Sequence, residues 1–110
     1  MSYQVDYEGQ LKIINPSVKV IAKLQMLCGA DLWEMGYDTD CRYLDLELAE
    51  GMEHLKHDGS EKSYEMGQQI QALLTEMRKD FPEFKLEGCL EVEDEFGGSY
   101  KVGGDGEKEF

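Results

Sequence analysis

Residues 66–93, MGQQIQALLTEMRKDFPEFKLEGCLEVE, change their hydrophobic period midway. In the first half, apolar residues recur at helical spacing and stop before Phe81-Pro82, a pattern typical of an amphipathic α-helix with one buried face. From Phe84 onward, apolar and charged residues alternate, which predicts a half-buried β-strand. The apolar stripe of the helix consists of Met66, Ile70, Leu73, Leu74 and Met77.

Turn signals lie on both sides of this stretch. Asp58, followed three residues later by Glu61, resembles a capping box and predicts that the helix begins there. Gly97-Gly98 predicts a turn into a shorter strand that carries Tyr100 and Val102. Residues 103–110 are rich in glycine and charge, so we expect a tail after the last strand.

The N-terminal part predicts a strand followed by a helix. Apolar residues alternate along residues 3–13 with an interruption at Gly9, where we expect a β-bulge. Ser17 can cap a helix that ends at Gly29. Residues 31–40 show no clean period, and we expect a loop whose aromatic side chains pack back on the core.

Residues 41–57 fit two structures. Leu44, Leu46 and Leu48 alternate with acids as in a strand, whereas Leu44, Leu48 and Met52 also fit one face of a helix. Glu50-Gly51 is a suitable turn between two short strands. We favour the hairpin, and the helix stays open.

These elements together predict one domain of class α+β that spans residues 1–110. The expected order is β-α-β-β-α-β-β, with an antiparallel sheet of about five strands and both helices on one face. The other face of the sheet would be left to solvent or to a partner.

The composition excludes several classes of function. The formal net charge of −13 over 110 residues repels nucleic-acid phosphates and anionic lipids, so we expect neither direct nucleic-acid binding nor membrane binding. The chain begins without a basic and apolar leader and contains no long apolar run. We therefore expect a cytoplasmic protein.

No arrangement of residues predicts catalysis, and we expect neither an enzyme nor a bound metal or cofactor. His54 and His57 would face opposite sides of a strand, so they could not readily share a metal ion. The acidic runs lack the spaced ligands of a calcium loop. Cys28, Cys41 and Cys89 form no C-x-x-C pair, and we interpret them as small buried thiols.

Three short segments carry a resemblance. Residues 9–13 are GQLKI and run into Asn15-Pro16, residues 58–64 are DGSEKSY, and residues 86–91 are LEGCLE. In this order they are similar to segments of small uncharacterised proteins encoded by bacteriophages and prophages. In those proteins a first strand ends at proline, a DG-x-EK-x-Y segment opens a helix, and a G-x-hydrophobic-E strand leads into the last hairpin. The resemblance supports the hairpin in residues 41–57, implies a phage context with anti-CRISPR-like proteins as one class, and supplies no established activity.

The acidic residues are unevenly distributed. Residues 31–65 have a net charge of −8 and residues 81–110 one of −6, whereas residues 1–30 have one of +1. Along a strand, Glu87, Glu91 and Glu93 would form a row of anions at multiples of roughly 6.7 Å, a density comparable to that of a nucleic-acid strand. Such a row can imitate phosphates.

The sequence thus leads to two functional hypotheses. In the first, a phage-type protein inhibits a defence complex in the host cytoplasm, such as a CRISPR effector or a restriction enzyme, by occupying its basic nucleic-acid site. In the second, a structural protein assembles into a homo-oligomer through its exposed sheet. The residues predicted to contact the basic host protein or nucleoprotein complex are Asp45, Glu47, Glu87, Glu91, Glu93, Asp94 and Glu95, with Trp33 and Tyr37 as aromatic anchors.

Overall fold

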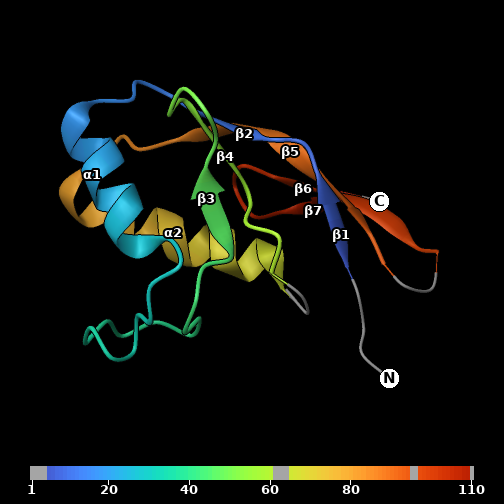
Figure 1. The fold of residues 1–110 in the computed structure, drawn as a ribbon, viewed down its shortest axis with the longest axis horizontal. Helices are drawn as coiled ribbons and strands as arrows, with labels where there is room; N and C mark the ends of the chain where they lie inside the picture. The colour runs from blue at the N-terminus through green and yellow to red at the C-terminus, as the bar shows by residue number, and fades with distance from the viewer. Residues whose placement is uncertain (1–4, 61–64, 95–96, 110) are drawn as a thin grey trace.

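The computed structural model describes residues 5–60, 65–94 and 97–109. Seven strands and two helices follow one another in these residues, and the class is α+β, as the sequence predicts (Figure 1). The elements are β1 (Asp6–Glu8), β2 (Leu11–Ile13), α1 (Val18–Leu27), β3 (Leu46–Leu48), β4 (His54–His57), α2 (Met66–Asp80), β5 (Leu86–Glu93), β6 (Ser99–Gly103) and β7 (Lys108–Glu109).

The ends of α1 follow from its sequence, whereas the start of α2 does not. The Ser17 hydroxyl accepts a hydrogen bond from the Val20 amide at 3.2 Å, and Gly29 follows the helix with a positive φ, so both predicted ends of α1 are confirmed. The N-terminal cap residue of α2 is Glu65, so the start predicted from Asp58 is wrong. Asp58 instead accepts a hydrogen bond from the Ser60 amide, and Glu61 lies outside the described residues.

The sheet is antiparallel and is organised around β5. The strand order is β3-β4-β2-β5-β6-β7, and β1 pairs with the far half of β5. The count exceeds the five strands expected because the first predicted strand is divided at Gly9 and because the predicted tail forms β7. The hairpin in residues 41–57 is confirmed as β3 and β4.

A kink replaces the expected bulge at Gly9. Glu8 pairs with Glu91 before the interruption and Leu11 with Gly88 after it, so both strands skip the same number of residues and the register is unchanged. Gly9 and Gly88 both have positive φ, and a Cβ on Gly9 would lie 3.0 Å from the Cys89 carbonyl oxygen. The two glycines let both strands bend together, so the sheet changes direction without losing its alternation.

The predicted tail is part of the folded structure. β7 pairs with β6, and Gly104 and Gly106 in the intervening turn are buried. The turn packs on the first turn of α2, where a Cβ on Gly67 would lie 2.5 Å from the Gly106 carbonyl oxygen. Phe110 lies outside the described residues.

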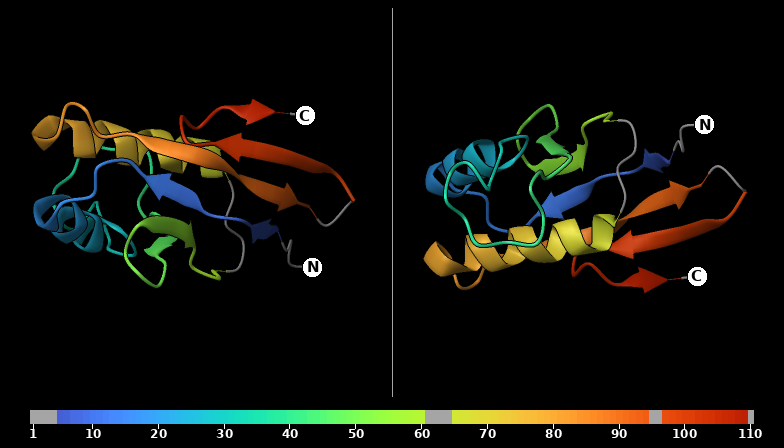
Figure 2. Two further views of the ribbon diagram at one scale, coloured as in Figure 1. Left: turned by 90° about the horizontal axis from the view of Figure 1, so that it is seen from above. Right: turned by 90° about the horizontal axis from the view of Figure 1, so that it is seen from below.

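Both helices lie on one side of the sheet, and the strands extend beyond them at one end (Figure 2). The core between the layers contains the predicted stripe of α2 together with Leu11, Leu24, Leu90 and Val102, all of them buried. We call β1, residues 91–93 of β5, β6 and β7 the distal sheet, and β2, β3, β4 and the start of β5 the proximal sheet.

Candidate functional site

The register of the distal sheet places carboxylates directly opposite one another. Asp6 pairs with Glu93 and Glu8 pairs with Glu91, and all four residues are exposed. Residues opposite each other in an antiparallel pair point to the same side, here the side away from the helices, because their neighbours Tyr7 and Val92 pack on the core. Two like-charged pairs therefore lie side by side on the outer face of the sheet.

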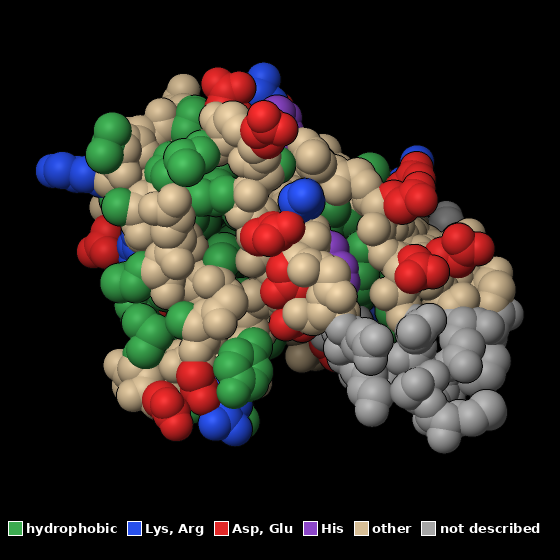
Figure 3. Space-filling model, viewed as in Figure 1, with side chains coloured by type: hydrophobic (Ala, Val, Ile, Leu, Met, Phe, Trp, Pro, Cys, Tyr) green, Lys and Arg blue, Asp and Glu red, His purple; other side chains and the backbone are tan. Residues whose placement is uncertain are grey.

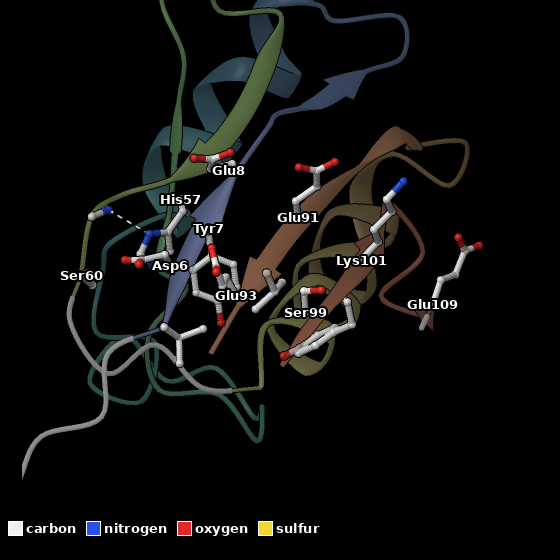
Figure 4. Close-up of a pocket in the computed structure, with 14 residues that line it drawn as sticks. Asp6, Tyr7, Glu8, His57, Ser60, Glu91, Glu93, Ser99, Lys101 and Glu109 are labelled. Carbon is white, nitrogen blue, oxygen red and sulfur yellow. Dashed lines mark hydrogen bonds between the residues drawn. The ribbon is translucent and has the colours of Figure 1, made fainter. Parts of the chain in front are cut away.

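The strands on the other side of β5 extend this surface. Lys101 of β6 lies opposite Glu91, and Glu109 of β7 lies opposite Lys101. Figure 4 shows Glu8, Glu91 and Lys101 projecting to the same side from three neighbouring strands. We call Asp6, Glu8, Glu91, Glu93 and Glu109 the acidic face; Figure 3 shows Asp and Glu side chains over the distal strands as well as over other parts of the molecule.

The charge of the acidic face is not neutralised within the described chain. The ion pairs among residues 5–60, 65–94 and 97–109 include none of its carboxylates. On the proximal sheet, by contrast, Glu47 lies 3.5 Å from the Lys56 ammonium and Glu87 lies 4.0 Å from the Lys85 ammonium. The outer face of the sheet thus has a mixed proximal half and an acidic distal half.

The acidic face borders an open hollow of about 970 Å³ at the end of the distal sheet. Tyr7 and His57 line the hollow from the helix side (Figure 4), and Tyr100 also lines it. The Tyr7 and His57 rings lie 4.4 Å apart, and His57 Nδ1 accepts a hydrogen bond from the Gly59 amide. Burial raises the pKa of the Tyr7 hydroxyl, and the nearby Tyr100 and acidic groups act in the same direction, so this phenol stays protonated at neutral pH.

Of the predicted acidic contact residues that the structure describes, Glu91 and Glu93 belong to the acidic face, Glu47 and Glu87 lie on the proximal sheet, and Asp45 and Asp94 lie elsewhere. Asp45 is half-buried on the helix side, where Gln69 Nε2 of α2 donates to its carboxylate at 3.0 Å. Asp94 accepts a hydrogen bond from the Gly98 amide at 2.8 Å and thereby shapes the β5–β6 turn. Glu95 lies outside the described residues.

The predicted aromatic anchors lie in the loop after α1, away from the distal sheet (Figure 1). Tyr37 packs against the core as expected, but Trp33 is 54% exposed, so the expectation that it packs back on the core is wrong. The Trp33 indole donates to the Thr39 carbonyl, and the Arg42 guanidinium lies 5.6 Å from its ring. Hydrogen bonds from Arg42 lower the pKa of the Asp31 carboxyl.

Asp6 and Glu8 belong to the site, but the sequence analysis did not select them. The alternation of Val5 and Tyr7 with these acids indicates that they share the outer face of a strand. The sequence does not show that this strand lies beside Glu91 and Glu93, because that pairing joins segments more than 80 residues apart.

The histidines and cysteines form no second site among the described residues. His54 and His57 lie on opposite faces of β4, as predicted, since His57 stacks on Tyr7 and His54 pairs with Lys12. Within the described part of the chain, no three His, Cys, Asp or Glu side chains are grouped as metal ligands would be. The three cysteines are free, and burial with the nearby Asp58 charge raises the pKa of the Cys28 thiol to about 12.

Comparison of the chain with family models, with curated proteins and with solved structures gives no match. Neither of the two helices in the described residues combines the length and the apolar composition needed to cross a membrane.

Proposed function

We propose that the chain binds a basic nucleic-acid site on a partner protein through its acidic face, and thereby excludes nucleic acid from that site. The observation that supports the proposal is the direct opposition of Asp6 to Glu93 and of Glu8 to Glu91. Opposed like charges destabilise a sheet, so a surface that retains them is suited to a partner that supplies the missing cations.

The spacing of the carboxylates suits this role. Side chains on one face of a strand repeat at roughly 6.7 Å, and neighbouring strands lie about 4.8 Å apart. Asp6, Glu8, Glu91 and Glu93 thus form a compact array of anions on a sheet, with a linear charge density near that of a nucleic-acid strand. Lysine and arginine side chains that bind phosphates can bind such an array instead.

The net charge favours rapid and salt-dependent association. At −13, the chain is attracted as a whole to a basic channel, and the acidic face sets the orientation in which it docks. The resemblance of three short segments to phage proteins suggests the class of target, namely a CRISPR effector or a restriction enzyme of the host. Self-association through the same face is disfavoured because it would place carboxylates against carboxylates.

The test is a competition between the chain and labelled duplex DNA on a set of CRISPR effector complexes and restriction endonucleases. The double substitution Glu91→Lys with Glu93→Lys reverses the centre of the acidic face. The matched control is Glu50→Lys with Glu53→Lys, which changes the net charge equally at exposed positions in the β3–β4 turn. We expect the chain to displace DNA, and the first double variant to lose at least about tenfold in affinity while the control loses little.

Equal losses in both variants would show that only overall charge matters. Inhibition of cleavage while DNA stays bound would also contradict the proposal. Circular dichroism of both variants checks that a loss of affinity does not come from unfolding.

A further inference from the structure

A groove runs between α1 and β3, at the end of the molecule opposite the acidic face. Its volume is about 410 Å³. Leu24 and Gln25 of α1 and Cys28, the residue that caps its C-terminal end, form one wall. The other wall consists of residues 46–49, and Met52 lies at its rim; Figure 3 shows hydrophobic side chains between the positions of α1 and β3.

The wall on β3 is a backbone edge. Residues 46–49 are consecutive, and their side chains alternate between the two faces of the sheet, so the feature they share toward the groove is the main chain. β3 is the last strand on this side of the sheet in the described residues. An edge strand of this kind carries amide and carbonyl groups that are arranged to pair with another strand.

The hydrogen bonds of β3 show which groups face the groove. The Ala49 amide donates to the His54 carbonyl, and the Asp45 carbonyl accepts from Asp58, so these odd-numbered residues bond to β4. Their neighbours Leu46 and Leu48 therefore direct their backbone groups away from β4.

Leu44, two residues before Leu46, is the preceding outward position, and its carbonyl is already hydrogen-bonded within the chain. The Gly29 amide, just after α1, donates to the Leu44 carbonyl at 3.1 Å. The same kind of bond at Leu46 and Leu48 would continue this line of pairing along the groove. The outward backbone groups of Leu46 and Leu48 are thus arranged for an additional strand beside β3.

The surroundings of the groove define what such a strand must carry. Leu46, Leu48 and Met52 offer apolar contacts, and Met52 is 49% exposed with a positive φ of 59°. A flexible, exposed methionine in a strained conformation is suited to a binding rim. Asp58 and Glu47 also line the groove, and since Lys56 neutralises Glu47 in part, their combined charge is still negative and favours cationic side chains next to the apolar ones.

We propose that this groove binds an extended peptide segment of a basic partner protein, which pairs with β3 as an additional strand. Backbone hydrogen bonds to Leu46 and Leu48 give the affinity, and apolar side chains of the peptide contact the wall of α1. Lysine or arginine residues at alternate positions lie near Glu47 and Asp58. The proposal does not depend on the acidic face.

The test uses fluorescein-labelled octapeptides with Lys or Arg at alternate positions and Val, Ile, Leu or Phe between them. Binding is followed by anisotropy at about 0.15 M salt, where long-range attraction is screened. We expect at least one peptide to bind, the amide signals of Leu46 and Leu48 to shift in NMR spectra, and their exchange with solvent to slow. The same peptide with every second amide methylated should not bind.

Gln25→Trp blocks the groove from an exposed position of α1 and should weaken binding about tenfold or more. Gln68→Trp, at an exposed position of α2, is the matched control and should bind as the unmodified chain does. The variant with Glu91→Lys and Glu93→Lys should also retain peptide binding, which separates this site from the acidic face.

Three outcomes would overturn the proposal: no binding of any peptide up to about 1 mM, undiminished binding by the Gln25→Trp variant, or equal binding of the methylated peptide. A dimer that Gln25→Trp dissociates would assign the groove to a second copy of this chain and would overturn it as well.

Discussion

Gly67→Ala should destabilise the fold although alanine is the better helix former. The new Cβ would lie 2.5 Å from the Gly106 carbonyl oxygen and 3.9 Å from Val102 Cγ1. The oxygen belongs to the backbone of a turn that is itself fixed, since a Cβ on Gly106 would lie 2.6 Å from the Gly67 carbonyl oxygen. The close contact therefore cannot be relieved by rotating a side chain.

The expected magnitude is the difference between two effects. Overpacking of this kind costs about 1–3 kcal/mol, and shifts of the backbone put the cost near the upper end. Replacing glycine by alanine in a helix returns up to about 1 kcal/mol, and less at the second residue of α2, where the helix has barely begun. We expect a net loss of about 1–2 kcal/mol, which lowers Tm by roughly 5–15 °C in a domain of this size.

Urea denaturation followed by circular dichroism measures this loss. Gln68→Ala is the control, because it lies beside Gly67 on α2, is exposed, and should change stability by no more than about 0.5 kcal/mol. An increase in stability for Gly67→Ala would refute the reasoning. It would mean that the β6–β7 turn does not pack on α2 and that residues 103–109 behave as the tail expected from composition.

Three further outcomes are expected. Gln69→Ala removes both hydrogen bonds to Asp45 and should lower the free energy of unfolding by about 1–2 kcal/mol in urea denaturation, whereas Gln68→Ala should not. Glu93→Gln relieves the repulsion by Asp6, and the residue opposite Glu93 on β6 is the uncharged Ser99, so this substitution should raise that free energy by about 0.2–1 kcal/mol at low salt, with the gain shrinking at high salt. The Cys28 thiol, with its pKa raised to about 12, should react with iodoacetamide far more slowly in the folded chain than in urea at pH 8, as mass spectrometry of the modified peptide would show. Its contribution to stability is fully present below about pH 9, where the unfolded thiol stays protonated, and is lost as the pH rises toward 12.

The elements that the sequence predicts are those defined by local patterns. The apolar stripe of α2, the Ser17 cap and the Gly29 stop each depend on residues within a few positions of one another, and each is confirmed. The hairpin of β3 and β4 also follows from local alternation and a turn. In these cases the period of the side chains and the chemistry of the turn are sufficient.

The features that the sequence does not predict depend on contacts between distant segments. α2 begins at Met66, after the apparent capping box at Asp58, and its first two residues, Met66 and Gly67, are buried against the rest of the fold. The kink at Gly9 depends on Gly88 in a strand that pairs with it only after folding. The β7 strand likewise requires the contact between Gly106 and Gly67.

The candidate site shows the same division. Alternation alone predicts that Glu87, Glu91 and Glu93 share a face, and the register agrees. Asp6 and Glu8 join the acidic face because β1 pairs with β5. Asp45 lies outside the acidic face, where its carboxylate is hydrogen-bonded to Gln69. Periodicity assigns a residue to a face, but it does not identify the neighbouring strand.

The distribution of lysines on the outer face favours the proposed binding surface over one that only confers solubility. Lys12, Lys56 and Lys85 lie among the acids of the proximal sheet, so this sequence does place cations next to carboxylates on the same face. On the outer face of the distal sheet, five carboxylates lie around one lysine of the described residues, Lys101, because Lys108 of β7 pairs with Val102 and lies over the Tyr100 ring on the helix side. Solubility requires a net charge with both signs interspersed, which the proximal half already satisfies. The segregation of charge at the distal end costs stability through opposed carboxylates, and binding of the proposed basic partner would offset that cost by supplying cations.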